Sequence, residues 1–326
     1  MSSFAAASEI NDTLNYENPI MIITAGPTGS GKSQLLEKTL DVIYKSSELM
    51  QSFERLSMDD YVQDSECYKS KVDRILKMYE NTGRNLNNPS KLLLKQMSDA
   101  YFNIRNKGPC TGPCNNKSIP GCDDIYDSDL NDIISSSKNV VIETTGKMVP
   151  IWYLEKLVEK SKFGEYNVIF AYSLVEFEAL RRRNISRSKT QIKSFIKDYM
   201  NKPAPRFPDI STEIFKNATK EIIDVLLLIR NECMAKPTPR LEQCGQINNS
   251  NKFTLLIFDN NNRPSELIYD SRNPEHSNMS DTEFKELLDG YHLSGGNPKR
   301  GRIHKSKNMK KQFYLKKTIR KMRVNK

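Results

Sequence analysis

The octapeptide GPTGSGKS at residues 26–33 lies between an apolar run, residues 20–25, and a helix-like stretch, residues 34–43. Backbone N–H groups can wrap a polyphosphate closely only where no Cβ collides with it, so such loops need glycine at fixed positions. The spacing GxxxxGKS between a strand and a helix is that of a phosphate-binding loop. We therefore expect eight residues to bind the phosphates of a purine nucleoside triphosphate: Gly26, Pro27, Thr28, Gly29, Ser30, Gly31, Lys32 and Ser33.

The last two residues of this loop have types that can do chemistry. In a phosphate-binding loop the lysine reaches the β and γ phosphates, and the hydroxyl that follows binds Mg²⁺. The N-terminal end of the next helix adds partial positive charge near the same anion. The sequence thus predicts a purine nucleoside triphosphate, ATP or GTP, and Mg²⁺ as cofactors, with Lys32 as a catalytic residue and Ser33 as the metal ligand.

Two adjacent carboxylates, Asp59 and Asp60, follow a predicted strand at residues 53–57. Ligands bind at the carboxyl ends of parallel strands. Phosphoryl transfer to a hydroxyl needs a carboxylate that takes the hydroxyl proton, and Asp59 suits this role. Because side chains alternate along a strand, only one of the two would face the site, so Asp60 is the second choice. A turn or helix cap at this point would use aspartate equally well.

Arginines can supply the cations that stabilise the transferred phosphoryl group. Successive helical residues rotate by ~100°, so Arg181, Arg182 and Arg183 cannot share one face. Arg183 and Arg187 are four residues apart and do share one, so we expect them to act as a pair on a helical lid. Arg206, in the proline-bounded segment PAPRFP, is the third catalytic candidate. Each can instead be a solvated residue that neutralises nearby acids.

Predicted strands and helices alternate along the chain, which indicates an α/β fold. We expect a P-loop NTPase three-layer sandwich with a mostly parallel central sheet, a helical lid or insertion, and a basic C-terminal tail. A short helix is predicted to begin at Ser128 as its N-cap. The expected divisions are a flexible N-terminus at residues 1–17, the nucleotide-binding domain at 18–272 with its insertion at about 81–138, a linker at 273–297 and the tail at 298–326.

The net charge of +10 is concentrated in the tail. Residues 298–326 contain nine Lys, four Arg and no acidic residue, whereas the rest of the chain has 37 basic and 40 acidic residues. The tail can contact RNA or DNA non-specifically, act as a nuclear address, or be merely solvated. No apolar stretch approaches the ~20 residues of a membrane span, and the first 15 residues lack the order of a signal peptide. We expect a cytoplasmic, intracellular protein, or a nuclear one if the tail is an address.

Three of the six cysteines, Cys110, Cys114 and Cys122, lie in one loop rich in glycine and proline. A disulfide framework is not expected in an intracellular chain. Three thiolates can hold Zn²⁺ only with a fourth ligand, and none of the three histidines is near in sequence. A flexible loop with free thiols is the expectation, and a zinc site is the alternative.

Between residues 19 and 271 the chain resembles the zeta-toxin-like P-loop kinases, which share their nucleotide-binding core with phage-type polynucleotide kinases. The resemblance lies in GPTGSGKS, in Asp59 two residues before Tyr61, in VIETT at residues 141–145, and in the downstream arginines. It implies ATP-dependent phosphorylation of a hydroxyl. In zeta toxins that hydroxyl belongs to UDP-N-acetylglucosamine, and in the polynucleotide kinases it is the 5′ end of RNA or DNA.

The resemblance also implies roles for single residues. Glu143 and Thr145 match positions that contact the acceptor, Asp60 is placed on the substrate side with them, and Arg206 matches the family's second arginine. An inhibitor protein is a further implied partner. The cysteine-bearing insertion has no family equivalent, and Thr144 stands where the family has glycine.

Two functions of different classes follow as hypotheses. A kinase would use Lys32, Asp59 and the arginines to move a γ-phosphate onto a small-molecule or nucleic-acid acceptor. A nucleic-acid-binding NTPase switch without kinase activity would bind through the tail, with nucleotide ordering the lid. Removal of Asp59 would separate the two, because only the kinase needs it.

Overall fold

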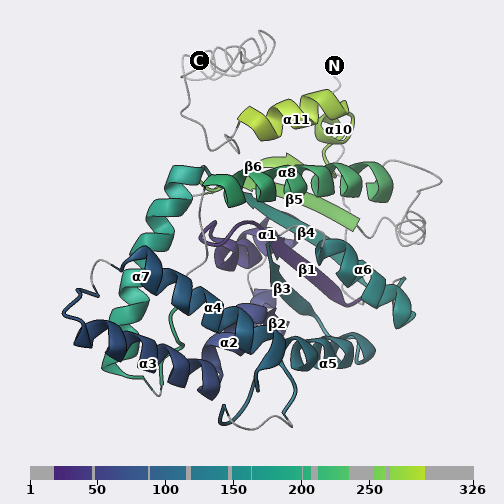
Figure 1. Ribbon diagram of the computed structural model, residues 1–326. Helices are drawn as coiled ribbons and strands as arrows, with labels where there is room; N and C mark the ends of the chain where they lie inside the picture. The colour runs from purple at the N-terminus through teal and green to yellow at the C-terminus, as the bar shows by residue number, and fades with distance from the viewer. Residues whose placement is uncertain are drawn as a thin grey trace, which may run out of the picture. The chain divides into compact units, whose positions relative to one another are not determined.

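Six strands form one sheet in the computed structural model, in the order β2-β3-β1-β4-β5-β6 (Figure 1). The first five strands are parallel and the sixth is antiparallel to the fifth. Every residue of the two central strands, β1 and β4, is buried, as expected for strands that are covered on both faces. Their bounds are β1 (Ile20–Ala25), β2 (Glu54–Ser57), β3 (Val140–Thr144), β4 (Asn167–Leu174), β5 (Phe253–Asp259) and β6 (Glu266–Asp270). The mostly parallel α/β fold that the sequence predicts is confirmed.

The structure describes most of the expected nucleotide-binding domain. The described ranges are 18–45, 48–86, 89–114, 119–145, 149–162, 164–199, 201–206, 212–234, 253–261 and 265–290. The predicted flexible N-terminus and basic tail lie outside them. Within these ranges, no helix has the length and apolar character needed to cross a membrane.

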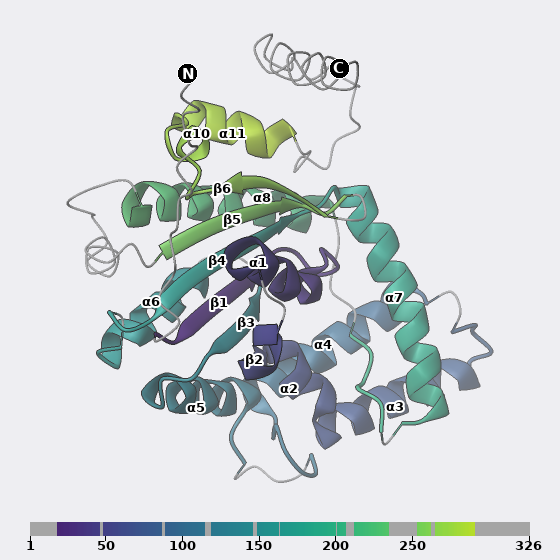
Figure 2. The same ribbon diagram turned by 180° about the vertical axis from the view of Figure 1, so that it is seen from behind.

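Helices cover both faces of the sheet, which gives the three expected layers (Figures 1 and 2). The helix α1 (Leu35–Tyr44) packs on one face through Leu35, Leu40 and Tyr44. The other face is covered by α5 (Cys122–Ser135), α6 (Val149–Glu159) and α8 (Thr212–Leu228). Because β1 continues directly into the GPTGSGKS loop and then α1, the loop lies at the carboxyl edge of the sheet.

A second apolar cluster lies beside this sandwich and forms the helical lid and insertion. It joins α2 (Met58–Asp64), α3 (Glu66–Asn81), α4 (Lys91–Lys107) and α7 (Phe177–Lys197). Serine caps begin two of these helices, since the Oγ of Ser65 accepts from Tyr68 N and that of Ser90 from Leu93 N. The buried side chains of Tyr68, Tyr101 and Phe195 fill the cluster.

The cysteines correct one prediction. Cys67 is bonded to Cys114, and Cys110 to Cys122, so these four are disulfides and not free thiols. The fold brings Cys67 on α3 to the loop between α4 and α5, although 47 residues separate it from Cys114. Among the described residues, no group of three or more His, Cys, Asp or Glu side chains is arranged to hold a metal ion. The alternative of a zinc site in this loop is therefore not supported.

Three expected elements also differ. Asp59 and Asp60 follow β2 as expected, but they lie in the first turn of α2, so the alternation of side chains along a strand does not decide which of them faces the site. The helix that was expected from Ser128 begins six residues earlier, at Cys122, where the Asp124 carboxylate accepts from the Gly121 N–H. Part of the predicted linker is helical, as α10 (Pro274–Ser277) and α11 (Asp281–Gly290).

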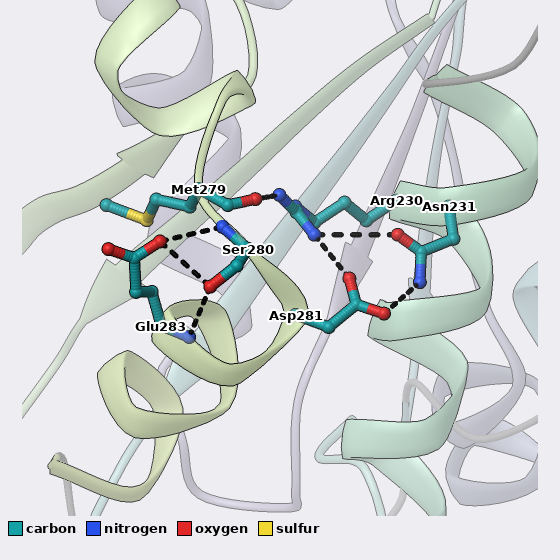
Figure 3. Close-up of polar contacts among 6 residues, drawn as sticks. All are labelled: Arg230, Asn231, Met279, Ser280, Asp281 and Glu283. Carbon is teal, nitrogen blue, oxygen red and sulfur yellow. Dashed lines mark hydrogen bonds and ion pairs between the residues drawn. The ribbon is translucent and has the colours of Figure 1, made fainter.

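The contacts of α11 explain why this segment is ordered (Figure 3). Phe284 and Leu288 on α11 are fully buried. Arg230, in the π-helical turn η3 (Ile229–Met234) after α8, donates to Asp281 Oδ1 at 2.7 Å and to the Met279 carbonyl, and lies 5.1 Å from the Phe284 ring centre. A reciprocal pair of hydrogen bonds between Ser280 and Glu283 caps the first turn.

Candidate active site

The glycine-rich loop has the backbone that phosphate binding requires. Gly26, Gly29 and Gly31 all have positive φ angles, of 146°, 88° and 90°. A Cβ on Gly29 would lie 2.7 Å from Nδ2 of Asn184, so glycine is required here for space as well as for conformation. The Lys32 ammonium lies against the loop itself, donating to Gly26 O at 3.0 Å and to Pro27 O at 3.4 Å.

Buried polar side chains from other strands and helices hold this loop in place. Asn184 on α7 donates to Thr28 O at 2.7 Å, and Ser173 at the end of β4 donates to Ser30 O at 2.8 Å. Asn260, directly after β5, also donates to Ser30 O. These three residues were not predicted from the sequence, because they are distant from the loop along the chain.

The electrostatic environment of Lys32 brings most of the predicted site together. Burial lowers the pKa of Lys32 to about 8, while the charges of Glu143 and Asp59 act to raise it and those of Arg206 and Arg187 act to lower it. An entering polyphosphate would add negative charge beside this lysine and stabilise its protonated form.

The predicted base, Asp59, is held by two side chains from outside its own helix. Tyr101 on α4 donates to Asp59 Oδ1 at 2.7 Å, and Arg206 forms an ion pair with Oδ2. The Arg206 guanidinium also lies 4.5 Å from the centre of the Tyr101 ring. The structure thus brings two of the predicted site residues, Asp59 and Arg206, into contact, and adds Tyr101.

The exit of β3 carries the other predicted acceptor contacts. Glu143 is mostly buried and pairs with Arg55 on β2, a residue that the sequence patterns did not single out. Burial, and then the charge of Glu143, raise the pKa of Asp60. Thr145 is exposed and lies directly after the strand.

The two lid arginines have different surroundings. Arg183 donates to Asn260 O at 2.7 Å and to Asn261 O at 3.3 Å, so it links α7 to the segment after β5. Arg187 donates to Asn184 Oδ1 at 3.0 Å. Burial and the nearby charge of Arg206 lower the pKa of Arg187.

A cavity of about 380 Å³ opens between the loop and the insertion. Six predicted site residues line it: Thr28, Lys32, Asp59, Glu143, Thr145 and Arg206. Asp60, Arg183, Arg187, Ser33 and the other residues of the glycine-rich loop do not. The far wall contains residues that sequence reasoning did not identify, from α4, α5 and α6: Arg105, Asp123, Tyr126, Asp127, Trp152 and Tyr153.

The residues present fit a magnesium nucleotide. The loop offers glycines with positive φ, a lysine, and Ser33 exposed in the first turn after the loop. Inside the loop the Ser30 Oγ is buried and has no hydrogen-bond partner among the described residues. These are the kinds of group that bind phosphate and a hard cation, and Ser33 is the residue that would bind Mg²⁺ directly. The charge of Glu143 acts on Lys32, so this carboxylate also lies near the loop.

No protein-family model and no curated protein matches the chain. Among solved structures, it is similar to one from the PezAT chromosomal toxin–antitoxin system of the human pathogen Streptococcus pneumoniae, with 14% identity and a TM-score of 0.42 over 83% of this chain and 77% of that one. A TM-score of this size means that the two backbones diverge over much of their length. The α/β fold, with its phosphate-binding loop between β1 and α1, is the one that the resemblance to zeta-toxin-like P-loop kinases implies.

Proposed function

We propose that this protein is an ATP- and Mg²⁺-dependent kinase that transfers the γ-phosphate to a hydroxyl of a small acceptor, of the nucleotide-sugar class. The observation that carries the proposal is the convergence of Lys32, Asp59 and Arg206 on one cavity beside the phosphate-binding loop. These are the three kinds of group that phosphoryl transfer to an alcohol needs.

Each residue has a definable task in this reaction. The acceptor oxygen bonds to the γ-phosphorus, the bond to the β,γ-bridging oxygen breaks, and the hydroxyl proton passes to Asp59. Lys32 and Arg206, with Arg187 at the lid, offset the charge on the transferred group. Bound through Ser33, Mg²⁺ would neutralise charge on the β and γ phosphates.

The size and lining of the cavity favour a small acceptor. Its volume is within the range of ~300–1,000 Å³ that is typical of small-molecule sites. The far wall combines aromatic side chains, Trp152, Tyr126 and Tyr153, with two carboxylates, Asp123 and Asp127. Such a wall can pack on a ring and accept hydrogen bonds from hydroxyl groups.

A 5′-hydroxyl polynucleotide kinase is the alternative within the same class. A nucleic-acid strand needs a positively charged groove. Four carboxylates and three basic side chains line this cavity, so the described lining does not form the continuous basic track that a strand of many phosphates needs. The alternative therefore depends on the tail at residues 298–326, as does the NTPase switch. An inhibitor protein stays a proposal that follows from the family resemblance.

The role of Asp59 can be tested against a matched aspartate in the same helix. Asp59→Asn should reduce transfer of labelled γ-phosphate by at least ~10²-fold, the lower end of the range for general-base catalysis. Asp64→Asn, at the exposed end of α2, should leave transfer unchanged. Equal activity of the two variants would contradict the kinase and favour the switch.

A further inference from the structure

We propose that Tyr101 is a positioning residue that aims the Asp59 carboxylate at the acceptor. This inference rests on the proposed kinase function. Tyr101 Oη donates to Oδ1 of Asp59 at 2.7 Å, while Arg206 takes Oδ2. The carboxylate is thus held at both oxygens, by a neutral donor on one and by a cation on the other.

Tyr101 is fixed far more firmly than a surface residue. Its side chain is 1% exposed, and its ring packs edge-on against Tyr68 at 6.0 Å and Phe102 at 5.4 Å. Burial also raises the pKa of Tyr101, so the phenol keeps its proton and stays a donor across the neutral range. A buried donor of this kind can define the orientation of the carboxylate that it contacts.

The two partners of Asp59 differ in how they respond to nucleotide. Arg206 is a cation close enough to Lys32 for the charges of the two side chains to interact. Because the phosphates of ATP would lie beside Lys32, an entering triphosphate attracts Arg206 away from the Asp59 carboxylate. Tyr101 is neutral and gains nothing by moving. Once Arg206 contacts phosphate, Oδ2 is open to the acceptor while Oδ1 stays on Tyr101.

This division assigns the proton transfer to one atom. The acceptor hydroxyl gives its proton to Asp59 Oδ2 as its oxygen bonds to the γ-phosphorus and ADP leaves. Tyr101 donates its hydrogen bond to Oδ1 throughout and exchanges no proton. The base is therefore oriented by α4, a helix of the insertion, and not by the sheet that carries the nucleotide loop.

The test is Tyr101→Phe in the full chain, assayed with Mg·ATP and UDP-N-acetylglucosamine as the acceptor probe, with Tyr79→Phe as control. Tyr79 is buried in the same cluster, but its hydroxyl contacts Ser90 N and not Asp59. We expect kcat of Tyr101→Phe to fall roughly tenfold, as for a lost hydrogen bond to a charged group, with KM for ATP unchanged. Tyr79→Phe should keep the wild-type kcat at a similar Tm.

Two results would overturn the positioning role. The first is a Tyr101→Phe variant whose kcat equals that of the wild type. The second is a Tyr101→Phe variant that loses kcat, ATP affinity and Tm together, because a parallel loss of all three is what removal of a purely structural residue causes. Asp59→Ala in the same assay separates this failure from that of the proposed function. An inactive Asp59→Ala beside a fully active Tyr101→Phe would remove only the role of Tyr101. An active Asp59→Ala would remove both, and so would a wild type that labels neither UDP-N-acetylglucosamine nor a 5′-hydroxyl RNA oligonucleotide.

Discussion

Lys32 is the residue at which burial and charge oppose each other most directly. Burial lowers its pKa from the usual 10.5 to about 8. Between those two values the unfolded chain binds the proton and the folded chain does not. The contribution of Lys32 to the free energy of unfolding therefore rises with pH from about 8 to about 10.5.

This pKa predicts a pH dependence for nucleotide binding. Phosphates favour protonated Lys32, so above pH 8 the binding of Mg·ATP must take up a proton, and affinity should fall up to tenfold per pH unit. Calorimetry at pH 9 in two buffers of different ionisation enthalpy should detect uptake approaching one proton per site, and little at pH 7. Lys32→Met should show no such uptake. Equal affinity at pH 7 and 9 would contradict the assigned surroundings of Lys32.

Gly29 allows a steric test of the loop, with Gly83 as its control. Both have positive φ, of 88° and 71°, but only at Gly29 would a Cβ collide with a neighbour, the Asn184 amide. Gly29→Ala should weaken Mg·ATP binding at least tenfold, because the loop must move. Gly83→Ala carries only the backbone strain of about 1–2 kcal/mol and should bind normally. Normal binding by Gly29→Ala, measured by the same calorimetry, would be inconsistent with a loop held by Asn184.

At the residue scale, the sequence predicted what is local. The loop and Asp59 could be found because their signals occupy a few consecutive positions. Tyr101 lies 42 residues from Asp59, and Asn260 lies 230 from Ser30, so no spacing in the sequence links them. A lone tyrosine in a helix is more often a core residue than a site residue. Tyr101 is buried in the core and also donates a hydrogen bond to Asp59.

At the scale of elements, strands were easier to predict than the helices of the lid. The central strands are continuous apolar runs, whereas α2 is a seven-residue helix with polar residues at most positions. The start of α11 had a readable signal, since Ser280 and Glu283 have the spacing of a capping box. The start of α5 had none, because glycine precedes it.

At the scale of elements, the disulfide between α4 and α5 of the insertion allows a further prediction. The disulfide Cys110–Cys122 ties the end of α4 to the start of α5. Arg105 on α4 and Asp123 on α5 form a 3.0 Å ion pair in the cavity wall. Replacing both cysteines by serine should lower stability by about 2–5 kcal/mol. It should also raise KM for the acceptor while Mg·ATP affinity stays unchanged, because the nucleotide loop is built by other elements.

Thermal unfolding and steady-state kinetics would check this prediction. Wild type treated with a reductant is the control and should approach the behaviour of the double variant. Four additional thiols should become titratable when the denatured wild type is reduced, from the two described disulfides. An unchanged Tm together with an unchanged acceptor KM would mean that this bond does not organise the wall.

At the scale of the whole molecule, two features bear on partners and location. Disulfides are typical of oxidising compartments, so the two in the insertion count against the predicted cytoplasmic location. The positive charge belongs to residues 298–326, and the remainder of the chain carries a small excess of acids. The basic tail and the residues of the candidate site therefore occupy different segments of the chain.

That separation predicts the effect of ending the chain at residue 297. The shortened protein should lose most of its salt-dependent affinity for an RNA oligonucleotide, since 13 cationic side chains are removed. Transfer to a small acceptor should stay within about twofold, because the cavity-lining residues that the structure describes all precede residue 298. Filter binding at several salt concentrations, alongside the transfer assay, would measure both. Loss of transfer to the small acceptor on truncation would contradict this separation of the tail from the site.

The most direct test of the central claim is transfer of labelled γ-phosphate from Mg·ATP by the wild-type chain, with UDP-N-acetylglucosamine and a 5′-hydroxyl RNA oligonucleotide offered in parallel. The proposed mechanism predicts label on the nucleotide sugar, none on the RNA, and no transfer by Asp59→Ala. Label on the RNA alone would replace the acceptor but keep the chemistry. ATP hydrolysis without any labelled acceptor, unchanged by Asp59→Ala, would contradict the assignment of the cavity as a kinase site.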